Sequence, residues 1–277
     1  MIAGDDSENE NEEVILRGYE YNASDMIHKP LDNDTVIQRV NNAIKRYNNG
    51  RYIEGKVEKQ NRKLIKQYKE SIECYNNLLD ILQNIIANRQ IEARPHLLRV
   101  AEYSRILATH YAKLYPRAKM TKKKINLIAE ASKMHDVGKI TMPDALIQRP
   151  GKLSKQELDS LMEHTLRGSE IMEVIGRFRN DDYGKIGYNI CKYHHAKYDG
   201  NGYPYGTKDN QIPIEAQIVS LADIYDVLIH EPINNHLHSE DEAFHILMEG
   251  KCGELAPRMK ECLASARMEL EMVKLND

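Results

Sequence analysis

The stretch HHAKYDGNGYPYGTKDNQIPIEAQIVSLADIYDVL, residues 194–228, contains the two signals on which the fold prediction rests. Its first half is a loop rich in Gly, Pro, Asn and Asp, whereas its second half has apolar residues at helical spacing. The chain beyond Glu92 repeats this alternation, and helices are predicted near 96–115, 121–136, 154–174, 183–195, 214–229, 240–250 and 256–273. Because strand signals are nearly missing there, we predict an all-α domain.

Two helix starts carry capping signals, at Thr121 and at Ser154 with Glu157 three residues later. The dipeptide His135-Asp136, in the segment ASKMHDVGKI, is expected to end a helix that Gly138 stops.

Histidines and carboxylates recur around these helices. Besides His135 and Asp136, the candidates are Glu92, His96, His164, His194, His195 and Asp223. Imidazoles and carboxylates without thiolates suit a hard or borderline divalent metal. The set exceeds what one ion needs, so we expect two ions bridged by one carboxylate, with a bridging oxygen that is nucleophilic near neutral pH. The other histidines, His28, His110, His230, His236, His238 and His245, are expected to be ordinary hydrogen-bonded residues.

With HDVGKITMPDALIQRPGKL (135–153) and EHTLRGSEIM (163–172), the opening stretch resembles the HD-GYP phosphodiesterase family over residues of about 89 to 265. This resemblance implies an HD-type helical bundle that hydrolyses cyclic di-GMP, or a related cyclic dinucleotide, to the linear dinucleotide or to GMP. It also implies two or three divalent metal ions, iron or manganese, and a role in bacterial second-messenger signalling.

The resemblance also assigns roles to individual residues. It implies one metal held by His96, His135 and Asp223, a second held by His164, His194 and His195, and a third held by Glu92. It further implies that Asp136 bridges two of the ions and that Lys139 neutralises the scissile phosphate. The family's namesake loop is Gly202-Tyr203-Pro204, which either contacts the substrate or braces a lid; Gly200 and Gly202 permit a positive φ there.

Three positions depart from the family pattern. Pro232 and Asn235 stand where members usually carry an Arg and a Lys that bind the substrate phosphates, and Ala196 replaces a common Glu. An active enzyme with weakened substrate capture fits this pattern, and so does a degenerate, non-catalytic module that signals through protein contacts. A general HD-type nucleotide phosphohydrolase is a further alternative.

Residues 1–48 follow a different pattern. A helix is predicted at Glu12–Tyr21, a strand at Asp25–His28, then Lys29-Pro30 and a helix that Asp34 caps and that ends near Gly50. This order resembles the last third of an α/β response-regulator receiver domain. The phosphate-accepting aspartate would lie upstream of Met1, so the receiver is expected to be truncated or vestigial.

A helical stalk is predicted over residues 49–90, ahead of the catalytic domain at 91–277. Its apolar residues form a heptad seam at Ile65, Tyr68, Ile72, Tyr75, Leu79, Leu82 and Ile86. We expect a homodimer through residues 57–88; the alternative is a single amphipathic helix packed on its own domain.

Composition excludes several classes of protein. The net charge of −3 argues against a partner that is a nucleic-acid polymer, and no window approaches the length of a membrane span. The acidic N-terminus does not resemble a signal peptide, and the four cysteines form no C-x-x-C pair. We therefore expect a cytoplasmic protein with reduced thiols.

Overall fold

The computed structural model describes residues 2–3, 16–17, 20–21, 23, 25, 27–28, 30–89, 93–149, 151–178, 181–204, 206–232 and 236–273. Contacts divide the chain into two compact units, Met1–Asn76 and Asn77–Asp277. Helix α2 (Asn33–Asn88) contributes residues to both. None of the described helices carries an apolar stretch long enough to span a lipid bilayer.

The first unit contains one small parallel sheet. Strands β1 (Ile2–Ala3) and β2 (Ile27–His28) pair in parallel, with Ile2 opposite Ile27. The carboxylate of Asp25 accepts hydrogen bonds from Arg39 and Arg46 at 3.0 and 3.4 Å, which ties this segment to α2. Most of the helix predicted at Glu12–Tyr21, and Lys29, lie outside the described residues, so the receiver fragment stays a prediction.

Helix α2 differs from its prediction at both ends. The capping side chain is Asp32, which accepts a hydrogen bond from the backbone N–H of Thr35 at 2.9 Å, and not Asp34. The helix also runs through Gly50 instead of ending there. A glycine inside a helix costs only about 1 kcal/mol relative to alanine, and the neighbouring Arg, Lys and Glu are good helix formers. The predicted boundary between residues 48 and 49 therefore falls inside one helix.

The heptad seam of α2 divides into two parts. Ile65, Tyr68 and Ile72 are 56%, 60% and 43% exposed, so their side chains face solvent in the single chain. Leu79 and Ile86 are only 4% and 1% exposed because their own chain covers them. The alternative of a helix packed on its own domain is therefore confirmed for the last turns of the seam, whereas the homodimer stays a prediction.

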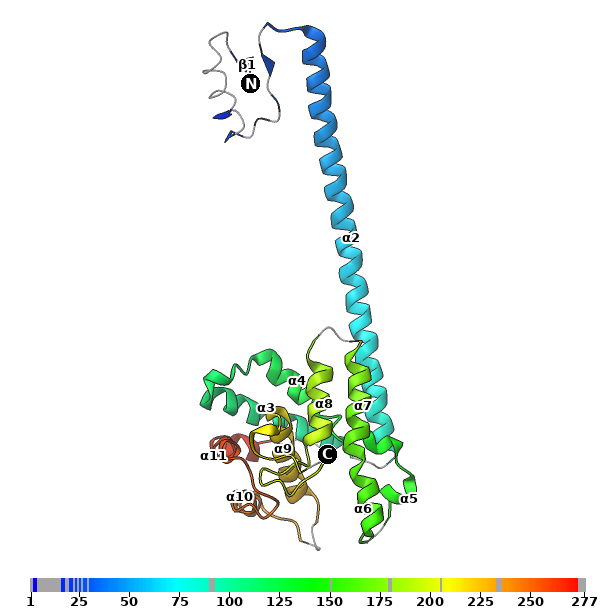
Figure 1. Cartoon of the computed structure of the whole chain (residues 1–277), viewed down its shortest axis with the longest axis vertical. Helices are drawn as coiled ribbons and strands as arrows, with labels where there is room; N and C mark the ends of the chain where they lie inside the picture. The colour runs from blue at the N-terminus through cyan, green and yellow to red at the C-terminus, as the bar shows by residue number, and fades with distance from the viewer. Residues whose placement is uncertain are drawn as a thin grey trace. The chain divides into compact units, whose positions relative to one another are not determined.

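The second unit is a bundle of helices (Figure 1). Its elements are α3 (Arg94–Leu114), η1 (Pro116–Ala118), α4 (Lys122–Ser132), η2 (Val137–Thr141), α5 (Asp144–Ile147), α6 (Lys155–Met162), α7 (His164–Gly176), α8 (Tyr183–Tyr193), η3 (Asp209–Gln211), α9 (Ile214–His230), α10 (Glu240–Met248) and α11 (Pro257–Glu271). The predicted all-α class is confirmed for this unit, as are the caps at Thr121 and Ser154.

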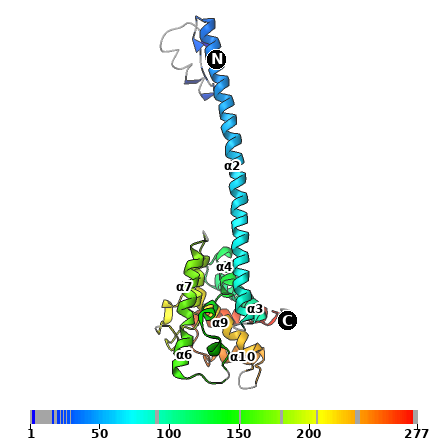
Figure 2. The same ribbon diagram turned by 90° about the vertical axis from the view of Figure 1, so that its right-hand side faces the viewer.

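Helix α3 contacts α4, α9 and α11, and Figure 2 shows α3, α4 and α9 within this unit. Helix α8 contacts α4, α7 and α9. The packing of α7 on α8 requires Gly176 and Gly184, because a Cβ built on Gly184 would lie 2.2 Å from the Gly176 Cα atom. Fully buried aliphatic side chains such as Leu107, Ile128 and Ile190 fill the spaces between the helices, and each stabilises the fold by about 1.5–3 kcal/mol.

Two predicted helices are interrupted at functional positions. The helix predicted at 121–136 ends at Ser132, and the helix predicted at 154–174 breaks at Glu163 into α6 and α7. In each place a histidine imidazole forms a hydrogen bond with a backbone carbonyl that would accept a backbone N–H in a continuous helix. The Nδ1 atom of His135 bonds the Ser132 carbonyl at 2.8 Å, and that of His164 bonds the Leu161 carbonyl at 2.6 Å.

Candidate metal centre

Five segments of the second unit bring the predicted metal ligands together. Helix α3 provides His96, and the turn after α4 provides His135 and Asp136. His164 is the first residue of α7, and His194 and His195 lie at the end of α8. Asp223 lies on α9. Possible ligand atoms of these residues fall into two groups, each with all atoms within 4.8 Å of one another. The groups are His96, His135 and Asp223, and Asp136, His164, His194 and His195.

The distances in the first group suit one shared ion. The Nε2 atoms of His96 and His135 lie 3.5 and 3.8 Å from Oδ1 of Asp223. Ligand atoms about 2.0–2.2 Å from one metal ion lie roughly 3.0–3.6 Å apart from each other at octahedral or tetrahedral angles. The three side chains therefore need only small adjustments to surround one ion.

Asp136 lies between the two groups. Its Oδ1 atom is 3.1 Å from Nε2 of His164 and 3.6 Å from Nε2 of His194. Its Oδ2 atom is 3.4 Å from Nε2 of His135 in the other group. One carboxylate thus presents a different oxygen to each group, as a bridging ligand between two ions does.

Hydrogen bonds orient the imidazoles of the centre. The Nδ1 atoms of His135 and His164 bond backbone carbonyls, and that of His194 lies 3.0 Å from the carbonyls of both Ile190 and Cys191. We assign the ring proton to Nδ1 in each case, because carbonyls only accept; this leaves the Nε2 lone pair for a metal.

Among the described residues, the buried polar atoms without a hydrogen bond include three in the Asp136 group. These three are Oδ1 of Asp136 and the Nε2 atoms of His164 and His194. Leaving a buried polar atom unsatisfied costs about 1–3 kcal/mol, and more when the group is charged. All three face the same space, so a divalent cation fits this donor set and would satisfy them together.

The electrostatics of the centre keep its ligands in the metal-binding form. Burial alone would raise the pKa of Asp136, but the charge of Lys139 holds that pKa well below its usual range. Burial lowers the pKa of His194 and, more strongly, that of His195. At neutral pH the carboxylate is therefore ionised and both imidazoles are neutral.

Lys139 is paired with the centre itself. Its Nζ atom lies 2.5 Å from Oδ2 of Asp136, one turn earlier in the chain. The ammonium group is thus at the edge of the centre, where an anionic group approaching the proposed metals would meet it.

Sequence reasoning missed two residues that support this centre. The buried carboxylate of Asp226 lies 2.7 Å from Nδ1 of His96 and accepts two hydrogen bonds from Arg99, at 2.6 and 3.0 Å. Burial would raise the pKa of Asp226, but the hydrogen bonds from His96 and Arg99 hold it below its ordinary value. The sequence could have indicated Asp226, because it lies three residues after Asp223 on the same face of α9.

The loop at residues 202–204 packs on the centre. The Tyr203 ring stacks on the His195 ring, with centroids 4.7 Å apart and an interplanar angle of 29°. Gly200 has a positive φ of 83°, whereas Gly202 does not use the freedom that glycine allows. Gly202 is required instead by close approach, because a Cβ there would lie 2.3 Å from the His195 carbonyl oxygen. This contact favours a bracing role for the loop.

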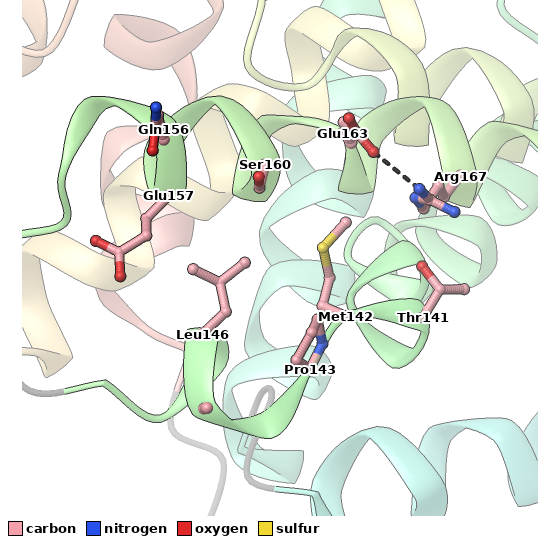
Figure 3. A pocket seen from close by; sticks show the side chains of 10 residues that line it. Thr141, Met142, Pro143, Leu146, Gln156, Glu157, Ser160, Glu163 and Arg167 are labelled. Atoms are coloured by element: carbon pink, nitrogen blue, oxygen red, sulfur yellow. Dashed lines mark hydrogen bonds and ion pairs between the residues drawn. The ribbon is translucent and has the colours of Figure 1, made fainter.

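A cavity of about 490 Å³ adjoins the segments that carry Lys139 and His164. It is bounded by η2, α5, α6 and the start of α7, and Figure 3 shows Met142 and Leu146 facing its interior. Arg167 lines the same cavity and donates a hydrogen bond to Glu163 at 2.9 Å, which is drawn as the dashed line. No motif in the sequence had indicated this cavity.

Some predicted site residues are not tested by the described structure. Glu92 and Asn235 lie outside the described residues. Pro232 is exposed just after α9, so no cation stands at that position.

Comparison with known proteins finds relatives along most of the chain. A family profile described as HD domain matches residues 80–252. A probable cyclic di-GMP phosphodiesterase of Vibrio cholerae is 27% identical over 89% of this chain and 57% of its own length. A cyclic di-GMP phosphodiesterase of the same organism is 32% identical over 65% of this chain and 37% of its own. A 3'3'-cGAMP-specific phosphodiesterase, also from Vibrio cholerae, is 30% identical over 69% of this chain and 34% of its own. The chain thus spans less than two thirds of the length of each of these relatives.

Proposed function

The chain belongs to the HD domain family, and we propose that it is a metal-dependent phosphodiesterase that opens cyclic di-GMP or a related cyclic dinucleotide. The observation that carries this proposal is the pair of ligand groups on either side of Asp136. In this proposal His96, His135 and Asp223 hold one divalent ion, and His164, His194 and His195 hold a second. Asp136 serves both ions, and Glu92 serves a third where one is bound. Iron and manganese are the proposed metals.

Divalent ions in such a site supply Lewis-acid polarisation of a phosphoryl oxygen and a water of lowered pKa. The protein's own groups position and neutralise the substrate. Lys139, 2.5 Å from Asp136, is placed to neutralise a phosphate at the centre. Asp226 and Arg99 keep the His96 ring fixed, and Tyr203 covers one face of His195.

The cavity beside the centre is the proposed site for part of the nucleotide. Its volume of about 490 Å³ lies within the usual range for small-molecule sites. Met142 and Leu146 offer apolar contacts to a base, while Arg167 and Glu163 offer a donor and an acceptor to the edge of a base.

A non-catalytic signalling module is the second candidate function. The exposed Pro232 favours this second candidate, because members of the family that the sequence resembles usually carry a phosphate-binding arginine at this position. A general HD-type nucleotide phosphohydrolase is less consistent with seven clustered ligands, since it would need fewer.

We also propose that the chain acts as a homodimer and that residues 1–48 derive from a receiver domain. The exposed seam at Ile65, Tyr68 and Ile72 supports the dimer. The parallel pairing of β1 with β2 supports the receiver fragment, because receiver strands are parallel. A cytoplasmic location stays a prediction.

Anaerobic reconstitution with Fe²⁺ or Mn²⁺, followed by assays with cyclic di-GMP and 3'3'-cGAMP, tests the enzymatic proposal. We expect at least two ions per chain and release of linear dinucleotide or GMP. Asp136→Asn should lose metal and activity together, whereas Lys139→Met should keep its metal and lose roughly 10²–10³-fold in rate. A fully metal-loaded protein that hydrolyses neither substrate would favour the non-catalytic module.

A further inference from the structure

A third group of possible ligands lies away from the proposed metal centre, between α9 and α10. It consists of His236 and His238 on the connecting segment and Glu242 on α10, and it is called the His236 cluster below. One ligand atom from each of these side chains lies within 4.8 Å of the other two. The sequence had given no reason to treat either histidine as more than an ordinary polar residue.

The distances within the His236 cluster suit a single small cation. Nε2 of His236 lies 3.5 Å from Oε2 of Glu242, and Nδ1 of His238 lies 3.9 Å from the same oxygen. Two ligands of a tetrahedral zinc ion lie about 3.3–3.5 Å apart, given bonds of roughly 2.0–2.2 Å. The first of these pairs already matches that spacing, the second needs an adjustment of less than half an ångström, and the ligand atoms of the two histidines lie within 4.8 Å of each other.

Hydrogen bonds hold Glu242 and the backbone of His238 in place. Glu242 belongs to a capping box, in which its Oε2 atom accepts hydrogen bonds from the Ser239 N–H at 2.8 Å and from the Ser239 hydroxyl at 3.2 Å. The backbone N–H of His238 donates to the Leu228 carbonyl at 3.3 Å, which anchors the segment to α9. His236 and His238 are two residues apart in non-helical backbone, so both rings lie on the same side of the segment, with centroids 4.8 Å apart.

We propose that the His236 cluster is a separate binding site for Zn²⁺ or a similar borderline divalent cation. Two imidazoles and one carboxylate form a common zinc ligand set, and a fourth position stays open to water or another ligand. The ion would tie the segment after α9, which begins near Pro232, to the first turn of α10. This inference does not depend on the proposed phosphodiesterase activity.

The competing explanation is an ion pair between a protonated histidine and Glu242. Zinc binding distinguishes the two, because protonated imidazole does not coordinate metal. We would measure bound Zn²⁺ by elemental analysis after dialysis of the full chain against buffered Zn²⁺, and the melting temperature with and without the ion. The variants are His236→Ala with His238→Ala, and Glu242→Gln, which keeps an oxygen for the capping box.

We expect both variants to bind one equivalent of Zn²⁺ fewer than the unmodified chain and to lose part of its zinc-dependent rise in melting temperature. His245→Ala is the matched control, since it removes an exposed imidazole of α10 outside the cluster, and it should bind as much Zn²⁺ as the unmodified chain. Equal zinc contents in all four proteins would overturn the proposal. Failure of the proposed metal centre would instead lower the zinc content of all four proteins together and leave the one-equivalent difference in place.

Discussion

Gly138→Ala should disrupt the metal centre without touching any ligand. Gly138 lies in η2, two residues after Asp136, where η2 packs on the start of α7. A Cβ atom on this residue would lie 1.9 Å from the His164 carbonyl oxygen and 2.6 Å from the Gly168 nitrogen. Both neighbours are backbone atoms, so no flexible side chain can move aside.

The size of the effect follows from these distances. Real Cβ contacts do not fall below 3.0 Å, so η2 and α7 must separate by at least 1.1 Å, the difference between 3.0 and 1.9 Å. Asp136 and His164 are 3.1 Å apart across this same contact, and metal–ligand distances tolerate only about 0.2 Å of change. We expect metal content to fall at least tenfold, and the fold to lose about 1–3 kcal/mol from overpacking.

Elemental analysis and urea unfolding measure the two effects. The matched control is Gly50→Ala, because a Cβ there meets nothing within 4 Å, in a helix. The control should keep its metal and gain about 0.5–1 kcal/mol of stability, as expected for removing a helical glycine. If Gly138→Ala retains the full metal content of the unmodified chain, the argument from the η2–α7 contact is wrong.

Three further predictions concern the support of the centre, substrate capture and the stalk. Asp226→Asn should weaken metal binding about 10–100-fold, measured by chelator competition, because it changes the partner that orients His96; unchanged affinity would contradict this role. Pro232→Arg with Asn235→Lys should lower KM for cyclic di-GMP without changing metal content, since each charge-assisted phosphate contact contributes about 1.5–3 kcal/mol; a repaired, metal-loaded protein without activity would exclude weak capture as the explanation. Ile65→Asp with Ile72→Asp should convert the proposed dimer to a monomer in light scattering, because a buried charge at a helix–helix seam is poorly tolerated. If the unmodified chain is already a monomer, the proposal that the seam joins two chains is wrong.

Sequence periodicity predicted the helices of the bundle well, because their apolar faces are long and regular. It failed where side chains compete with the backbone for hydrogen bonds. The breaks at His135 and His164 come from imidazoles that occupy carbonyls of the preceding turn. The prediction that a helix ends near Gly50 was also wrong, because an exposed glycine weakens a helix without ending it.

The metal ligands could be named from the sequence only through the resemblance to a family, because they come from five separated segments. Spacing alone could not distinguish His164, which belongs to a ligand group, from His236, which lies in a different cluster. Asp226 lies three residues after Asp223 on α9, but its pairing with Arg99 was harder to predict, since the two residues are 127 positions apart and meet only in the folded chain. Long-range pairing of this kind leaves no local pattern in a single sequence.

Arg89, which directly follows α2, contacts a turn next to the proposed site. Arg89 donates hydrogen bonds to the Met142 carbonyl at 2.9 Å and to Asp144 at 3.1 Å, and also to the Ile140 carbonyl. Ile140 and Met142 flank the end of η2, which carries Lys139, and Met142 lines the cavity beside the centre. Because one rigid guanidinium holds both carbonyls, the end of α2 cannot shift without moving this turn or breaking bonds of about 1.5–3 kcal/mol each. Arg89 thus connects the end of α2 directly to the turn that carries the proposed phosphate-binding lysine.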